Sequence, residues 1–296
     1  MDSIDSKNPH LQQTSTNQPL PPVGISAVPA SQSVMNPGPM IVSGVPSNLG
    51  LVACVICKIA PYDAPRKSLY CGSTCMQTAM RMAPGIVEIP PSHPKFADVS
   101  YQFRAKWLHT NVPFKPAKHI YLILNSPASA ASYNAYRAKV EQQGNFKATG
   151  KSEGNENRRF HGTTRQCHLG DPGNTQLCSN STCALCGILR TSFDLKFYKG
   201  KTGWGRFGCG LYTSSTSSKS DSYTANKSPS PYKAMLLAKV VVGRGYKMTR
   251  DATTLTAPPT NYHSVLGEPD ASGSLNYDEL VVYDNDAIRP AYLIVY

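Results

Sequence analysis

The stretch FGCGLYTSSTSSKSDSY, residues 207–223, sets two glycines around a cysteine and then places eight hydroxyl side chains within ten positions between two tyrosines. A flat aromatic ligand can lie between two tyrosine rings while small hydroxyls and backbone amides meet its polar edge. Small residues also let the backbone approach such a ligand. Runs of Ser and Thr usually form loops, however, and tyrosines usually pack in cores, so this stretch alone does not specify a ligand site.

Two other motifs complete a pattern with this stretch. RRFHGTT (158–164) places a histidine before a glycine and a hydroxyl, and NYDELVVYDNDAIRPAYLIVY (276–296) places a glutamate at the head of a strand. In this order the three motifs resemble the catalytic domain of the poly(ADP-ribose) polymerases, whose diphtheria-toxin-like subgroup carries a histidine, a tyrosine and a glutamate on separate strands. The resemblance covers about residues 90–296. The segment that precedes the histidine motif, including IYLILNS (120–126), is similar to the corresponding part of tankyrase-like catalytic domains.

The resemblance implies a role for individual residues. It makes His161, Tyr212 and Glu279 the catalytic triad, and it assigns contacts with NAD to a longer set: His161, Gly162, Thr163, Tyr212, Ser220 and Tyr223. His161 would bind ribose hydroxyls, Gly162 and Ser220 would meet the nicotinamide carboxamide, and the two tyrosines would enclose the nicotinamide ring.

Physical chemistry independently supports the role of Glu279. Breaking the nicotinamide–ribose bond develops positive charge on the ribose, which a fixed carboxylate stabilises best in a water-poor cleft. The same carboxylate can accept the proton of the acceptor group. Taken singly, His161 could be a hydrogen-bonded core residue and Glu279 a solvated strand end. Three motifs in the same order favour the site.

The sequence therefore predicts an NAD-dependent ADP-ribosyltransferase that transfers ADP-ribose from NAD to a protein acceptor and releases nicotinamide, with the chain itself among the candidate acceptors. Transfer of single units or of a polymer stays open, as does the oligomeric state. Two alternatives remain. One is ADP-ribosylation of nucleic acid, and the other is a non-catalytic NAD-binding or scaffolding protein whose zinc modules bind a partner.

Four of the nine cysteines form a compact set with a familiar spacing. Cys54 and Cys57 make a CxxC pair, and after thirteen residues Cys71 and Cys75 make a CxxxC pair. A CxxC pair presents two thiolates to one tetrahedral ion, and a second pair at the start of a helix can complete the site. Four thiolates leave no open coordination position, so we expect structural zinc. Scattered buried thiols are the less favoured alternative.

CHLGDPGNTQLCSNSTCALC (167–186) holds a second candidate zinc set: Cys178, Cys183 and Cys186, with either Cys167 or His168 as the fourth ligand. The intervening loop is rich in Gly, Asn and Ser and has few apolar residues to order it by packing. A metal ion would supply that order. A redox-active thiol pair is the alternative and predicts one unusually reactive cysteine.

Composition divides the chain into three parts. Residues 1–48 are rich in Pro, Ser, Gln and Asn and predict a disordered tail. Residues 49–85 are predicted to form the first zinc module, ending in a short helix. Residues 86–296 are predicted to form the catalytic domain, with a zinc-binding insertion at about 165–188.

Apolar periodicity predicts the fold class. Strands are expected at 120–126, within 232–248 and twice within 279–296, and a helix is expected at 128–143. KATGKSEGNENR (147–158) is expected to be a loop. Strands separated by long loops, with few helices late in the chain, indicate an α+β fold with a mostly antiparallel split sheet and flanking helices.

Charge is the last global signal. The formal net charge is +12, from 30 Lys and Arg against 18 Asp and Glu, and residues 51–150 alone contribute +8. Such a surplus can attract nucleic acid, although a solvated surface explains it equally well because no dense basic run exists. No run approaches the ~20 apolar residues of a membrane span, and the start lacks a secretory signal. We therefore expect a cytoplasmic or nuclear protein without membrane contact.

Overall fold

Two apolar segments near the end of the chain form the centre of the main sheet. In the computed structural model, which describes residues 52–65, 68–198, 205–273 and 275–296, every residue of β11 (Ile288–Val295) is buried. All but one residue of β7 (Ala234–Val241) are buried as well. Strands buried on both faces read as continuous apolar runs, and helices must then cover each face. The predicted tail, residues 1–48, lies outside the described residues.

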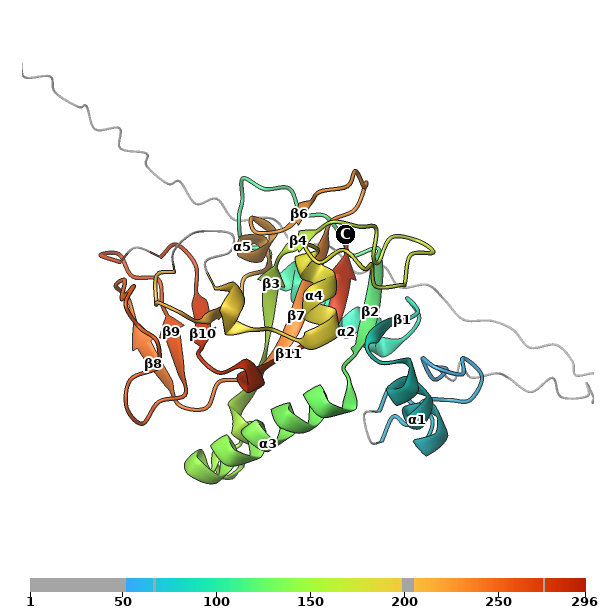
Figure 1. Ribbon diagram of the computed structural model, residues 1–296, viewed down its shortest axis with the longest axis horizontal. Helices are drawn as coiled ribbons and strands as arrows, with labels where there is room; N and C mark the ends of the chain where they lie inside the picture. The colour runs from blue at the N-terminus through green and yellow to red at the C-terminus, as the bar shows by residue number, and fades with distance from the viewer. Residues whose placement is uncertain (1–51, 66–67, 199–204, 274) are drawn as a thin grey trace, which may run out of the picture. The chain divides into compact units, whose positions relative to one another are not determined.

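The main sheet has five strands and is antiparallel throughout. Its order is β1-β2-β11-β7-β3, with β1 (Gly85–Glu88) and β3 (Glu156–Gly162) at the edges and β2 (His119–Leu124) beside β11. Figure 1 shows these strands in the middle of the view. The edge strand β3 contains the first five residues of the histidine motif, 158–162.

A second sheet of four strands adjoins the first. Its order is β5-β10-β9-β8, formed by β5 (Leu211–Thr213), β10 (Glu279–Val282), β9 (Ser264–Gly267) and β8 (Gly245–Met248). Only its β8–β9 pair is parallel. A single bridge between Phe160 and Ser214 connects the edge of β3 to the residue after β5. The expected α+β fold with a mostly antiparallel split sheet is therefore confirmed.

Helices cover both faces of the main sheet. On one face α2 (Pro94–Ala105) buries Phe103 in a cluster with Leu237 of β7. On the other face α4 (Ala184–Thr191) buries Leu189 in a cluster with Leu236. Figure 1 shows α4 in front of β7. The remaining described elements are α1 (Ser73–Met82), α3 (Pro127–Gly144), α5 (Ser217–Asp221), β4 (Thr164–Arg165), β6 (Ala225–Asn226) and four 3-10 turns at Phe146–Thr149, Glu153–Asn155, Leu195–Phe197 and Asn285–Ala287.

The helix expected at 128–143 is present as α3 with clear end signals. Ser126 caps its first turn by accepting a hydrogen bond from Ser129 N at 3.3 Å, and Pro127 occupies the first helical position. Asn145 ends it in the left-handed conformation, with φ of 47°. Local chemistry therefore fixes both ends of this helix.

The loop expected at 147–158 is only partly correct. Two 3-10 turns occupy its first part, but β3 already begins at Glu156. The sequence pattern did not predict the start of β3, because the first residues of this edge strand are polar. Glu156 and Arg158 project from a polar stretch of the sheet face, so no apolar alternation marks the strand.

Residues 48–296 form one compact unit, which holds both the first cysteine set and the main sheet. Val55 and Ala79 pack in the same cluster as Phe103. A boundary between a zinc module and a catalytic domain near residue 85 stays a prediction. Across the described residues, no helix combines the length and apolar character needed to traverse a lipid bilayer.

Candidate active site and metal centres

Strands β3, β5 and β10 bring the three motif residues to one region. His161 lies near the end of β3, Tyr212 lies in the middle of β5, and Glu279 begins β10. His161 Nδ1 lies 2.9 Å from the carbonyl oxygen of Tyr212, which fits a ring N–H donating to that carbonyl. Val281 of β10 pairs with Tyr212 in the sheet. The edge of Phe193 also contacts the His161 ring, with centroids 5.0 Å apart, so the imidazole is oriented from two sides.

The two tyrosines of the motif lie near the charge of Glu279. The Tyr212 hydroxyl donates to Gly208 O at 2.7 Å and accepts from Phe207 N at 2.9 Å, which fixes its ring. Burial raises the pKa of Tyr212, and the Glu279 charge adds to the effect. Burial and then the Glu279 charge likewise raise the pKa of Tyr223, which follows α5 and is 39% exposed. Enclosure of a nicotinamide ring by this pair stays a prediction.

The end of β3 runs directly beside α5. A Cβ atom on Gly162 would overlap the carbonyl oxygen of Ser220, so this approach requires glycine. Ser220 is buried, and its carbonyl accepts a hydrogen bond from Thr224 Oγ1 at 3.3 Å. Thr163, the next residue after Gly162, is also buried. The two residues expected to meet the carboxamide are thus neighbours.

Glu279 is held by a lysine that the sequence analysis did not single out. Glu279 is only 9% exposed, and Lys219 Nζ lies 2.9 Å from its Oε1. The same ammonium donates to the carbonyl oxygens of Tyr277 at 2.9 Å and Asp278 at 3.1 Å. Glu279 Oε2 is buried and has no hydrogen-bond partner among the described residues. A buried oxygen without a partner in a native site calls for a ligand or a catalytic role.

Three of the eight hydroxyls between the two tyrosines bind a neighbouring carboxylate, which the sequence analysis also missed. Four donors bind Asp278: Ser214 Oγ (2.9 Å), Ser215 Oγ (2.8 Å), Thr216 Oγ1 (3.1 Å) and Ser215 N (2.8 Å). Burial alone would raise the pKa of Asp278, but these hydrogen bonds together lower it. The cluster ties the loop after β5 to the residue that precedes Glu279. The available sequence signal was the adjacent Asp–Glu pair at the head of a strand.

The first cysteine set gathers at one point, with all four Sγ atoms within 4.8 Å of one another: Cys54, Cys57, Cys71 and Cys75. Cys71 Sγ lies 3.8 Å from Cys57 Sγ and 3.5 Å from Cys75 Sγ. Four thiolates around one zinc ion at ~2.3 Å stand about 3.8 Å apart, so the spacing fits. The backbone N–H groups of Ile59 and Ala60 lower the pKa of Cys57 to about 6, which favours the thiolate.

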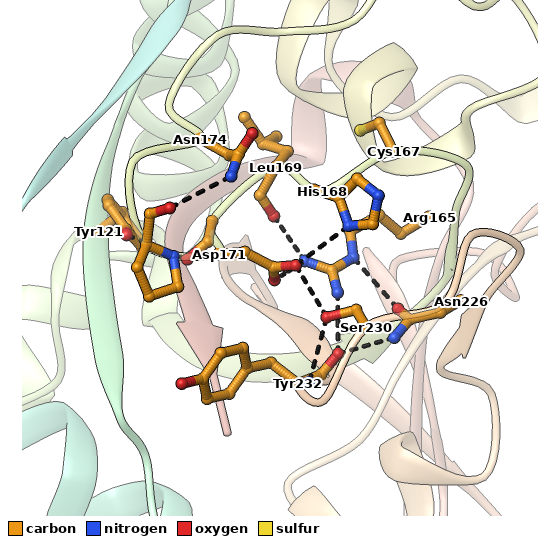
Figure 2. Close-up of polar contacts among 12 residues, drawn as sticks. Tyr121, Arg165, Cys167, His168, Leu169, Asp171, Asn174, Asn226, Ser230 and Tyr232 are labelled. Atoms are coloured by element: carbon orange, nitrogen blue, oxygen red, sulfur yellow. Dashed lines mark hydrogen bonds and ion pairs between the residues drawn. The ribbon is translucent and has the colours of Figure 1, made fainter.

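The second set also gathers within 4.8 Å, and its fourth member is a cysteine: Cys167, Cys178, Cys183 and Cys186. Cys167 Sγ lies 3.8 Å from Cys183 Sγ and 3.6 Å from Cys186 Sγ. His168, the other candidate, instead places its Nδ1 3.3 Å from Asp171 Oδ2. Figure 2 shows its ring directed toward that carboxylate. Between the two candidates, the geometry therefore favours Cys167.

A buried arginine anchors the loop that carries the second set (Figure 2). Arg165 is 1% exposed, and its guanidinium donates to Asp171 Oδ1 (2.6 Å), Leu169 O (2.8 Å), Tyr232 O (2.8 Å) and Asn226 Oδ1 (3.1 Å). Ser230 Oγ donates to the other oxygen of Asp171 at 2.8 Å. Such a network satisfies a buried charge with both a counter-ion and hydrogen bonds. A metal ion is therefore not the sole source of order in this loop.

Comparison with known protein families gives one match. Residues 134–272 match the family described as the poly(ADP-ribose) polymerase catalytic domain. The matched range contains His161, Tyr212 and the second cysteine set. Glu279 lies just beyond its end, and the first cysteine set precedes it.

Proposed function

We propose that this chain, whose residues 134–272 match the poly(ADP-ribose) polymerase catalytic domain, is an NAD-dependent ADP-ribosyltransferase acting on a protein acceptor, with the chain itself among the candidate acceptors. The observation that carries the proposal is the state of Glu279. Its carboxylate is buried, Lys219 fixes one oxygen, and the other oxygen has no hydrogen-bond partner among the described residues. A hydroxyl of a bound substrate would supply the missing hydrogen-bond partner of that oxygen.

In the proposed reaction, the bond between the nicotinamide nitrogen and ribose C1′ breaks. Both bonding electrons leave with nicotinamide, which neutralises the pyridinium nitrogen. Ribose C1′ gains oxocarbenium character, and the fixed charge of Glu279 stabilises it in a site of low dielectric. The acceptor nucleophile forms the new bond to C1′, and its proton passes to Glu279 Oε2.

Lys219 acts as a positioning residue in this scheme. Its ammonium bridges Glu279 Oε1 and the carbonyl oxygens of Tyr277 and Asp278. The bridge restricts rotation of the carboxyl group, so Oε2 keeps one orientation. Orientation of a reacting group before the reaction lowers the entropic part of the barrier.

The surrounding residues suit the nicotinamide half of NAD. Gly162 and Ser220 lie side by side and offer backbone and hydroxyl groups for the carboxamide. His161, oriented by Tyr212 and Phe193, is assigned to the ribose hydroxyls. Tyr212 and Tyr223, the pair that the family resemblance assigns to the nicotinamide ring, both lie close enough to Glu279 for its charge to add to the rise in pKa that burial causes.

Both cysteine sets are assigned to structural zinc. Each set offers four sulfur ligands at tetrahedral spacing, which leaves no coordination position for a substrate. When bound, each ion would cross-link its own loop to a neighbouring helix, α1 for the first set and α4 for the second.

The test is to incubate the purified protein with NAD labelled on the adenylate phosphate and to follow free nicotinamide and labelled protein together. Glu279→Gln keeps the size of the side chain but removes its charge, so we expect both signals to fall by ~10²-fold or more. Glu268→Gln is the matched control, because Glu268 is a partly exposed residue beyond β9 that pairs with Lys247.

Two results would contradict the proposal. Nicotinamide release without labelled protein would indicate a hydrolase. Binding of NAD with neither signal would indicate the non-catalytic NAD-binding protein.

A further inference from the structure

A basic groove lies on the face of the main sheet opposite to His161. Along the β3–β7 pair, Arg158 stands opposite Lys239 and His161 stands opposite Leu236. Because side chains of a strand alternate between its two faces, Lys239 shares a face with Leu237, not with Leu236. Leu237 packs in the cluster of α2, and Leu236 packs in the cluster of α4. The groove is therefore separate from the candidate active site, although β3 borders both.

The groove is large and strongly cationic. Its volume is about 900 Å³, and segment 68–70, α2, α3 and the sheet form its walls. Seven of its lining residues are basic: Lys95, Lys106, Arg137, Arg158, Arg159, Lys239 and Arg289. Among the described lining residues, Glu156 is the sole acid. The volume lies near the upper end of the ~300–1,000 Å³ typical of ligand pockets.

Internal ion pairs do not neutralise this charge. Five of the seven cations pair with four carboxylates: Asp98, Glu153, Glu156 and Asp286. Asp98 is shared by two cations, with Lys95 Nζ at 2.8 Å and Arg158 at 2.9 Å. Arg159 belongs to the His161 face of β3, so the other six cations exceed the four carboxylates by about two charges inside a concave surface, where the low-dielectric walls strengthen the field.

A buried polar atom of α2 along the groove, Gln102 Oε1, has no hydrogen-bond partner among the described residues. Unsatisfied buried groups are rare in native structures and call for a partner. A ligand with N–H groups would satisfy this oxygen.

The other lining groups suit bases and sugars. The side-chain amides of Asn125, Asn134 and Asn157 can donate and accept hydrogen bonds at base edges or ribose hydroxyls. Tyr70, a partly buried residue of the first cysteine module, offers an aromatic face for stacking. A simple anion would need none of these groups.

We propose that this groove binds a single-stranded nucleic acid. Its cations contact successive phosphates, its amides contact base edges, and Tyr70 stacks on a base. A single strand can enter a hollow bounded by two helices, whereas a rigid duplex meets only the rim. The inference goes beyond ADP-ribose transfer, because it requires neither NAD nor Glu279.

The probe is a fluorescein-labelled oligouridylate, and its dissociation constant is measured by anisotropy over a range of salt concentrations. In the variant Lys106→Gln/Lys239→Gln we expect roughly tenfold weaker binding, and a log–log salt slope shallower by ~1.4, because each phosphate contact on a single strand contributes ~0.7. Lys106 is exposed and Lys239 is 43% exposed, so both substitutions should leave the core intact.

The matched control is Lys147→Gln/Lys247→Gln, which removes the same charge away from the groove. Lys247 pairs with Glu268 much as Lys239 pairs with Glu156. The proposal is overturned if both double variants lose the same affinity for the oligouridylate, or if the groove variant loses none. Equal affinity for a duplex of the same sequence, or for an ADP-ribose polymer, overturns the assignment to a single strand.

A measurement on the unmodified chain makes the test independent of variant folding. A 4-thiouridine oligomer should cross-link at Tyr70 or at other groove residues, and cross-links confined to remote segments would refute the groove. Glu279→Gln should bind the oligomer as the unmodified protein does. If the unmodified protein binds the oligomer but transfers no ADP-ribose, only the proposed enzyme function is contradicted.

Discussion

Asp278→Asn is the substitution with the best-defined energetic consequence. Asp278 Oδ1 accepts hydrogen bonds from three hydroxyls, and Oδ2 accepts one from Ser215 N. An amide keeps the shape but removes the charge, so the three hydroxyl bonds should each weaken by about 0.5–1 kcal/mol. The amide NH₂ cannot accept from Ser215 N, which should cost about 1 kcal/mol more. We expect a total destabilisation of about 3 kcal/mol, equivalent to a melting temperature lower by about 6–12 °C for a domain of this size.

The pH dependence gives this prediction a second readout. The folded state lowers the pKa of Asp278 below its ordinary value of about 3.9, so its stabilising effect is present above that value and is lost as pH falls through the folded pKa. The difference in stability between the unmodified protein and Asp278→Asn should therefore shrink from about pH 4 downward.

Thermal and denaturant melts across pH, with Asp270→Asn as control, test both expectations. Asp270 also accepts hydrogen bonds from a serine, Ser272, but it is exposed, so its replacement should change stability by less than about 0.5 kcal/mol. If Asp278→Asn melts like the unmodified protein at neutral pH, the hydroxyl cluster does not have the structural role described above.

Three further predictions concern the anchors around the site. Cys57→Ser should lower the bound zinc from two equivalents to one by elemental analysis, and Cys186→Ser should do the same; unchanged metal content in either variant contradicts that site. Arg165→Met should destabilise the protein by about 3–5 kcal/mol, because it leaves the Asp171 carboxylate buried without its counter-ion; a denaturation midpoint within error of the unmodified protein would refute this. Lys219→Met should lower kcat for nicotinamide release by about tenfold or more while KM for NAD changes less, since it positions Glu279 rather than NAD; a change confined to KM would contradict the positioning role.

The parts of the fold that the sequence predicted are those with strong local signals. Strands β7 and β11 are buried on both faces and therefore appear as apolar runs. Helix α3 begins with Ser126 and Pro127, both of which are start signals. The cysteine spacing likewise singled out both groups that the structure gathers.

The parts that the sequence did not predict depend on contacts between distant segments. Strands β8 and β9 are short, and no local sequence pattern predicts that they form a parallel pair. The pairing of Lys219 with Glu279 joins a helix to a strand sixty residues later. The choice between Cys167 and His168 depended on the position of Asp171, which attracts the histidine. The binding of Ser214, Ser215 and Thr216 to Asp278 likewise joins two distant segments.

The basic groove also depends on segments that are distant in the sequence. Its cations come from α2, α3, β3, β7 and β11, so no run of Lys and Arg appears in the sequence. The surplus of charge in residues 51–150 was visible, but its position on one sheet face was not. Only the fold brings Lys106 and Lys239 to the same hollow.

The most direct test of the central claim is single-turnover release of nicotinamide by the unmodified protein and by Glu279→Gln, with NAD affinity measured separately by calorimetry. If the Glu279 carboxylate stabilises the oxocarbenium-like ribose, the rate should fall by ~10²-fold or more while the dissociation constant for NAD stays within about threefold. A Glu279→Gln variant that binds NAD and releases nicotinamide at the unmodified rate would show that this carboxylate does not perform the reaction.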